Sequence, residues 1–155
     1  MEQAEFFPQT QLKNNIDYVD LSTLEDFRSS SGGKKDWSFS DVPKGKYICY
    51  RTGYTNECHK DRGPVFPGVQ NKLTGKWLPC KIYENDISYP VVYISVNGMN
   101  KKLLMHKLVG QCFLINDQPK LKRTVDHKNR IRTDWSIDNL IWESQGNNAR
   151  NKGKL

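Results

Sequence analysis

Apolar residues follow their most regular pattern between residues 89 and 114. Residues 91–96 form an apolar, mostly β-branched run, Asn97-Gly98 follows, and residues 101–104 can return as a partner strand. Asn-Gly between two such runs is a strong hairpin signal. Apolar side chains then recur at steps of three and four residues over 105–114, the spacing of an amphipathic helix. This stretch predicts a β-hairpin with a helix packed onto it.

The pattern before residue 89 is less regular. Apolar runs at 47–54 and 77–83 predict two short strands, and the Pro and Gly residues at 63–68 are expected to break the chain between them. Leu and Phe recur at helical spacing over 20–27, where Ser22 is a candidate N-cap. We therefore expect a short helix and then an irregular β region. Trp37 and Phe39 are expected to anchor the N-terminal segment to the core.

The tail predicts a compact motif of its own. Strand-like residues at 124–127 and 139–143 enclose a polar loop, and residues 147–152 suit a short helix. The predicted fold class is therefore α+β: a small antiparallel sheet region and a helix, followed by a C-terminal ββα unit.

Composition limits the classes of protein that the chain can belong to. The 155 residues suit one ordinary domain, and 36% hydrophobic with 11% aromatic residues is enough for a core. No run approaches the roughly 18 apolar residues of a membrane span, and the first residues lack the basic start and apolar stretch of a signal peptide. We expect a soluble, unexported protein with no membrane partner, located in the cytoplasm.

The formal charge of +7 is concentrated in the C-terminal third. Residues 101–155 carry 12 basic and 5 acidic residues, whereas residues 1–42 carry 4 and 8. A polyanion is a natural partner for such a segment, although a solvated basic face would have the same composition.

The four cysteines contain no Cys-x-x-Cys pair, the spacing that structural zinc usually needs. Zinc is therefore not expected, and Cys49, Cys58, His59 and Cys80 are the one grouping worth testing. Reduced thiols that serve as small apolar residues are the preferred interpretation.

Candidate chemistry begins at Asp126 and His127. A carboxylate can bind a divalent cation and an imidazole can act as a base, and phosphodiester hydrolysis uses both. Neighbours on a strand point to opposite faces, so the strand must end or distort here. Asn139, 12 residues after His127, can brace the loop through backbone hydrogen bonds, and Asn148 can supply a second metal ligand from the terminal helix.

These residues carry a family resemblance. The segments His106-Lys107-Leu108-Val109, Val125-Asp126-His127, Asn139-Leu140-Ile141-Trp142 and Asn147-Asn148 together resemble the HNH endonucleases, most closely the phage and intron-associated branch. The resemblance covers residues 89–152. It departs from the family at Asp134-Trp135, where Asn-Asn is common, so the loop is expected to be held differently.

The resemblance implies a metal-dependent DNA endonuclease with a ββα-metal site. His127 corresponds to the general base, Asp126 and Asn148 to ligands of Mg²⁺ or Mn²⁺, and Asn139 to the bracing amide. Asn147 remains an alternative to Asn148 as the ligand.

The implied partner is double-stranded DNA, bound by a monomer or a homodimer. The candidate nucleic-acid contacts are His106, Lys107, Arg123, Lys128, Arg130, Arg132, Arg150 and Lys152. Trp135 and Trp142 are read as packing residues.

The expected organisation is an N-terminal extension at 1–45, an irregular β region at 46–88 that is a candidate DNA contact, and a nuclease domain at 89–155. A weakly catalytic DNA-binding module and a viral packaging or assembly protein remain as alternatives, as do nicking and double-strand cutting.

Overall fold

Four antiparallel strands form the larger sheet of the protein. In the computed structural model, which describes residues 12–13, 16–25, 37–83 and 89–144, these strands are β1 (Tyr18–Asp20), β2 (Tyr47–Tyr54), β3 (Phe66–Asn71) and β4 (Lys76–Trp77), in that spatial order. Short 3₁₀ helices, η1 (Leu21–Thr23), η2 (Phe39–Asp41) and η3 (Glu57–Arg62), lie along the same part of the chain.

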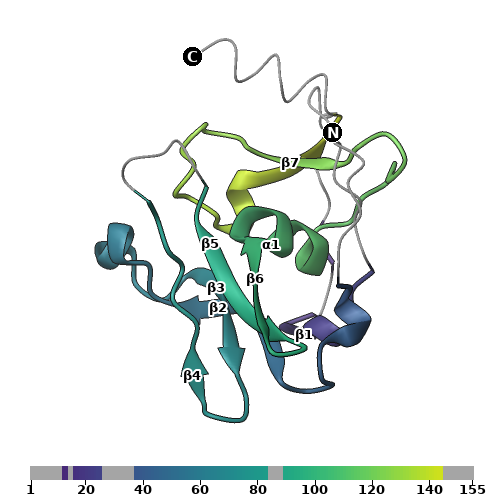
Figure 1. Ribbon diagram of the computed structural model, residues 1–155. Coiled ribbons are helices and arrows are strands. Elements are labelled where there is room, and N and C mark those ends of the chain that lie inside the picture. Colours follow the sequence, from purple (N-terminus) through teal and green to yellow (C-terminus); the bar gives the residue numbers. More distant parts are fainter. Residues whose placement is uncertain (1–11, 14–15, 26–36, 84–88, 145–155) are drawn as a thin grey trace.

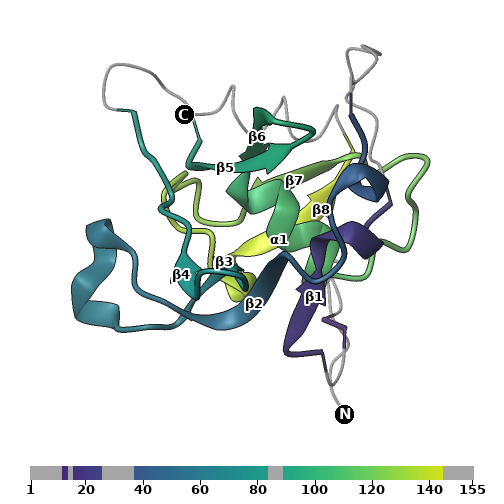
Figure 2. The same ribbon diagram turned by 60° about the horizontal axis from the view of Figure 1, so that its bottom comes forward.

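Two β-hairpins and one helix complete the described fold. Strand β5 (Val91–Val96) pairs with β6 (Met99–Leu104), the helix α1 (Met105–Phe113) follows directly, and β7 (Thr124–His127) pairs with β8 (Leu140–Glu143) after a long loop that ends in η4 (Ile137–Asn139). In Figures 1 and 2, α1 lies at the centre, with both hairpins and the sheet around it.

The predicted hairpin and helix at 89–114 are confirmed. Asn97 and Gly98 both adopt positive φ, 53° and 78°, as a two-residue turn between twisted strands requires. The strand at 47–54 and the pair of strands in the tail are confirmed as well. The predicted terminal helix at 147–152 lies outside the described residues.

Three predictions for the first half are wrong. Within residues 20–25, the described part of the predicted helix, there is one 3₁₀ turn, and Asp20, not Ser22, caps it by accepting from the Ser22 backbone N–H at 3.0 Å. Leu24 is already extended. The predicted strand at 77–83 shrinks to β4 and one isolated bridge between Lys81 and Val91, because Pro79 has no N–H to donate to a ladder.

Strand β3, where Pro67 and Gly68 were expected to break the chain, is the third difference. The pairing of β2 with β3 is irregular between Tyr50 and Tyr54, so the proline falls outside the regular ladder. Gly68 is needed here because a Cβ would lie 2.6 Å from Cβ of Tyr54.

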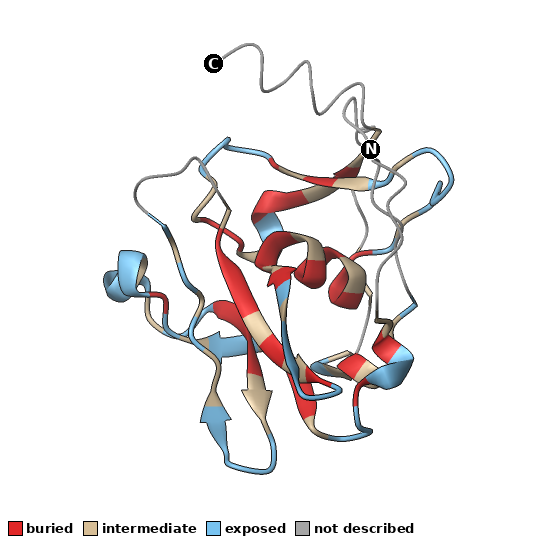
Figure 3. Cartoon of the chain, viewed as in Figure 1, coloured by how far each residue is buried: buried red, intermediate tan, exposed pale blue. Residues whose placement is uncertain are grey.

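One hydrophobic cluster joins all parts of the described chain. It includes Leu21 and Phe39 from the N-terminal segment, Cys49 and Val69 from the sheet, and Trp135 from the tail, all at most 1% exposed. Figure 3 shows the buried residues gathered on α1 and the strands around it, whereas η3 and the β3–β4 turn are exposed. Phe39 packs edge-on against Trp37 at 5.1 Å, so the predicted anchor is confirmed.

Close contact between α1 and the second hairpin depends on Gly110. A Cβ at this position would lie 2.7 Å from Cγ2 of Val125 and 3.5 Å from the ring of Trp142. The absence of that Cβ lets β7 and β8 lie directly on the helix. Because β7 ends at His127, Gly110 also fixes where the candidate base lies relative to α1.

Candidate active site

Three aromatic rings from distant parts of the chain meet at the end of β7. His127 is the last residue of β7, His106 lies in the first turn of α1, and Tyr89 precedes β5. The ring centroids of His106 and His127 are 4.9 Å apart, and Tyr89 lies 4.4 Å from His106 and 5.6 Å from His127, almost parallel to the latter. The guanidinium of Arg132 lies 5.2 Å from the centre of the Tyr89 ring.

Burial of this cluster is high. His127 is 3% exposed and His106 is 6% exposed. The two imidazoles are therefore held by packing as well as by the backbone elements that carry them. A substitution of Tyr89 is expected to alter the packing of the His127 ring.

Asp126 and His127 point to opposite sides of β7, as strand geometry requires. The side chain of His127 is buried and that of Asp126 is partly exposed. The Oδ1 of Asp126 accepts a hydrogen bond from the backbone N–H of the next residue, His127, at 2.9 Å. The strand ends at this point, so an acid and an imidazole both lie at the mouth of the following loop.

Asn139 braces that loop. Its Oδ1 accepts from the Asn129 backbone N–H at 3.0 Å, and its Nδ2 donates to Asn129 Oδ1 at 2.9 Å and to the Asp134 carbonyl at 2.8 Å. Its own carbonyl accepts from the Lys128 N–H at 2.7 Å. Three of these four hydrogen bonds thus tie Lys128 and Asn129, which directly follow His127, to Asn139, which directly precedes β8.

Asp134 is the second polar centre of the loop. Its Oδ1 accepts from both the N–H and the hydroxyl of Ser136, at 3.2 and 2.6 Å, and its Oδ2 receives Asn129 Nδ2 at 3.2 Å and Arg62 Nη1 at 3.3 Å. Burial raises the pKa of this carboxyl, but the Ser136 hydrogen bonds, the Arg62 charge and the Asn129 amide together hold the pKa below its usual value. Asp134 therefore holds the loop as an anion.

The other predicted site residues lie as follows. Arg123, Lys128 and Arg130 are exposed, and Lys107 and Arg132 are half-buried. Asn148, Asn147, Arg150 and Lys152 lie outside the described residues. Trp135 and Trp142 are buried, at 0% and 3% exposure, so their interpretation as packing residues is confirmed.

Sequence reasoning missed Tyr89 and Arg62. Tyr89 marks only the start of the regular hydrophobic pattern, and nothing in the local sequence indicates that it meets two histidines. Arg62 lies 72 residues before its partner Asp134, so no spacing rule connects them.

The grouping of Cys49, Cys58, His59 and Cys80 does not form a metal site. No group of three or more His, Cys, Asp or Glu residues within the described ranges could hold an ion. Cys49 is buried and Cys58 exposed, while His59 stacks on Phe66 at 5.5 Å. A hydrogen bond with Cys112, together with burial, raises the pKa of Cys49, and burial raises that of Cys80 to about 12, so these two thiols are protonated at neutral pH.

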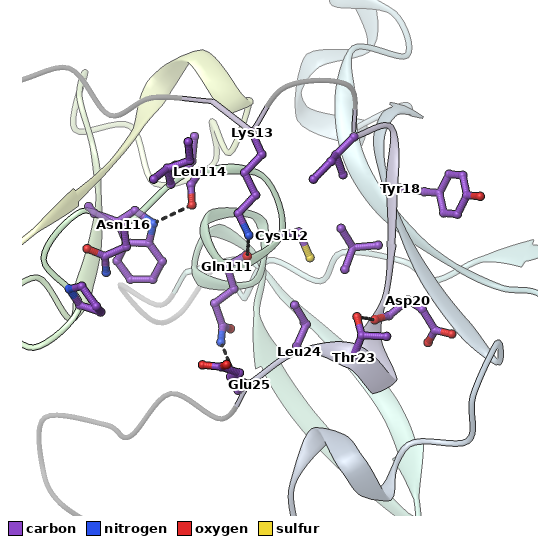
Figure 4. Close-up of a pocket in the computed structure, with 15 residues that line it drawn as sticks. Lys13, Tyr18, Asp20, Thr23, Leu24, Glu25, Gln111, Cys112, Leu114 and Asn116 are labelled. Atoms are coloured by element: carbon purple, nitrogen blue, oxygen red, sulfur yellow. Dashed lines mark hydrogen bonds between the residues drawn. The ribbon is translucent and has the colours of Figure 1, made fainter.

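A pocket of about 730 Å³ lies away from the ring cluster, at the C-terminal end of α1 (Figure 4). Lys13 crosses it to donate to the Gln111 carbonyl at 3.2 Å, and Gln111 donates to the Glu25 carbonyl at 3.2 Å. None of the predicted site residues lines it. None of the helices in the described part of the chain is long and apolar enough to span a bilayer.

Comparison with known proteins gives a consistent picture. No family model matches the sequence. Two proteins of Escherichia phage T5, the H-N-H endonucleases F-TflII and F-TflI, are each 32% identical to the chain, over 81 and 83 residues. The matches cover 51% and 52% of this chain but only 38% of each relative.

A solved structure of the HNH homing endonuclease I-HmuI, described by its DNA binding and cleavage, is similar in fold. The TM-score is 0.52 at 26% identity, and the match covers 72% of this chain and 56% of that one. The chain thus spans less than two thirds of the length of each of these three proteins.

Proposed function

We propose that the chain is a member of the HNH endonuclease family, to which the two phage T5 relatives and I-HmuI belong by name, and that it is a metal-dependent endonuclease that hydrolyses phosphodiester bonds in double-stranded DNA. The observation that carries the proposal is the end of β7, where Asp126 and His127 precede a loop that Asn139 holds through four hydrogen bonds. The phage T5 relatives favour a phage or mobile-element origin.

In this proposal His127 is the general base. It would take a proton from the water that attacks the scissile phosphorus. A base must reach that water, whereas His127 is 3% exposed. The proposal therefore includes a step in which the ring becomes accessible as DNA binds. Asn139 acts indirectly, as a positioning residue, because its hydrogen bonds fix the residues that follow the base.

Asp126 and Asn148 are the proposed ligands of Mg²⁺ or Mn²⁺. The bound ion would neutralise charge on the scissile phosphate and on the leaving oxygen. A carboxylate and an amide oxygen are hard donors of the kind that Mg²⁺ prefers, and water and phosphate oxygens usually complete its shell. The chemistry of Asp126 fits this role, and a third acidic or histidine ligand is not required.

DNA contacts are proposed for two surfaces. Near the site, Arg123, Lys128 and Arg130 are exposed cations suited to phosphates, and Lys107, Arg132, Arg150 and Lys152 are proposed to extend this surface. His106 is buried, so its proposed contact would depend on the same opening that exposes His127.

The second surface, the aromatic face, consists of Tyr18, Tyr50, Tyr54 and Trp77 on the sheet. The ring centroids follow one another at 5.6 to 6.1 Å in the order Tyr18, Tyr50, Trp77, Tyr54. Tyr18 is 62% exposed, and Lys72 Nζ lies 5.4 Å from the Tyr50 ring centre. Aromatic rings beside a cation suit nucleic-acid contact, which supports a DNA-binding role within residues 46–88.

A plasmid assay tests the activity. We expect purified protein to cut supercoiled DNA with Mg²⁺ or Mn²⁺, and EDTA to abolish cutting. His127→Ala should lower cutting by about 10²–10⁴-fold, the usual loss for a general base, with DNA binding retained. His59→Ala is the matched control, because it is the same chemical change at a histidine that stacks on Phe66 instead.

Each outcome separates the candidates. Equal cutting by wild type and His127→Ala would remove the base assignment. DNA binding without cutting, across several metals, would favour a DNA-binding module, and absence of both would favour an assembly role. Lys128→Ala should reduce the salt dependence of binding by about one counterion if Lys128 contacts a phosphate.

A further inference from the structure

We propose that Arg62, through Asp134, is a positioning residue for the candidate active site. This inference rests on the proposed function, because it assigns a role in the same reaction. Arg62 belongs to η3, in the sheet region, whereas Asp134 lies in the loop between β7 and β8. The two regions are therefore joined by an ion pair at the loop that directly follows the candidate base.

The connection from Arg62 to His127 has few steps. Arg62 Nη1 lies 3.3 Å from Asp134 Oδ2, and the same oxygen accepts from Asn129 Nδ2 at 3.2 Å. Asn129 in turn exchanges two hydrogen bonds with the Asn139 side chain. The Asn129 amide is thereby oriented by Asp134 on one side and Asn139 on the other. Asn129 lies two residues after His127.

Burial makes this ion pair more than a surface contact. The Asp134 side chain is 12% exposed, and Arg62 is 40% exposed. An exposed pair usually contributes little, but a buried carboxylate that loses its cation keeps the cost of its burial. The guanidinium also lies 4.8 Å from the centre of the Phe66 ring, which holds it over the loop.

Two further contacts fix the same junction. Asn56 Nδ2 donates to the Thr133 carbonyl at 3.3 Å, and Trp135 Nε1 donates to the Pro67 carbonyl at 2.9 Å. Both bonds cross from the sheet region to residues beside Asp134. We therefore expect the junction to keep its backbone in place when Arg62 alone is changed, so that the effect of Arg62 on the site can be measured in a folded protein.

The test compares Arg62→Gln with Lys60→Gln. Both variants lose one positive charge from η3, but the partner of Lys60 is the exposed carboxylate of Glu57, at 3.3 Å. We expect Arg62→Gln to lower the cleavage rate constant of bound DNA about tenfold relative to Lys60→Gln, because small misplacement of a reacting group is costly. The affinity for DNA should change equally in both. Arg62→Lys keeps the charge and should recover most of the rate.

Amide hydrogen exchange provides a readout that needs no DNA. We expect the Asn129 N–H, whose hydrogen bond Asn139 Oδ1 accepts, to exchange about tenfold faster in Arg62→Gln than in Lys60→Gln through local opening. This increase should exceed any change at the amides of the β5–β6 hairpin, which report the loss of global stability. Asp134→Asn should have effects on rate and exchange that do not add to those of Arg62→Gln.

Two results would overturn the inference. One is a loss of DNA affinity in Arg62→Gln with unchanged rate constant and unchanged exchange, which would make Arg62 a DNA contact. The other is additivity of the Arg62 and Asp134 variants. If wild type does not cut any DNA, the proposed function fails, while the exchange experiment still tests whether Arg62 orders the loop.

Discussion

The two hairpins that contact α1 differ in how their paired strands are connected. The β5–β6 strands are joined by two residues, Asn97 and Gly98, whose positive φ values make the turn. The β7–β8 strands are joined by residues 128–139, and hydrogen bonds among Asn129, Asp134 and Asn139 hold that connection. The first turn is local and exposed, and the second is a small polar core. A long connection of this kind can fix a reactive side chain at its start, which a tight turn cannot.

Asn139→Ala should show the largest difference between the two connections in unfolding free energy and in cleavage rate. The change leaves the Asn129 N–H and the Asp134 carbonyl without their partner, and a buried unsatisfied group costs about 1–3 kcal/mol. We expect unfolding by urea to show a loss of about 3 kcal/mol and the DNA cleavage rate to fall about 100-fold. Asn97→Gly is the matched change in the short turn and should stay within about 0.5 kcal/mol. Similar losses in both variants would contradict the comparison.

Gly110→Ala tests the attachment of the second hairpin to α1. The new methyl group would meet Val125 at 2.7 Å, and overpacking of this kind typically costs about 1–3 kcal/mol. Gly98→Ala is the counterpart in the first hairpin, where the added Cβ meets nothing within 4 Å and only the positive φ opposes it, at about 1–2 kcal/mol. Denaturant unfolding measures both. A Gly110 variant that retains full cleavage would show that α1 need not lie so close to β7.

Tyr89 can be varied to ask whether the ring or its hydroxyl matters for His127. The rings are almost parallel at 5.6 Å, so Tyr89→Phe should keep cleavage within about twofold, while Tyr89→Ala should lower it about tenfold by loosening the imidazole. Rates on a plasmid substrate distinguish the two. Faster cleavage by Tyr89→Ala would instead mean that the ring restricts access to the base.

The smallest expected effect is on acid stability. Because the pKa of Asp134 is lowered in the folded protein, its contribution is complete above the unfolded value near 3.9 and is lost as the pH falls through the lowered folded value. Wild type should therefore exceed Asp134→Asn by about 1 kcal/mol at pH 7, and the gap should close at low pH. Unfolding free energies across this range measure it, and a gap independent of pH would rule out the charged form as its source.

The same contrast explains what the sequence could predict. The β5–β6 hairpin follows from Asn97-Gly98 between two apolar runs, since its turn depends on neighbouring residues alone. The sequence also indicated that the loop departs from the family at Asp134, but not that Arg62 pairs with it, because that contact joins distant segments. Strand β3 was missed because Pro67 and Gly68 usually end strands, whereas here Tyr54 and Trp77 pack over the glycine.

Gly68 carries one more implication, for variation of the protein. The Tyr54 ring spans from Trp77 on the aromatic face to buried Trp135, at 6.1 and 6.2 Å, and it can lie there only over bare backbone. If position 68 were randomised and folded variants were selected, glycine should return almost alone, although the residue carries no chemistry of its own. The absence of a side chain at Gly68 thus allows Tyr54 to connect the aromatic face with the buried core.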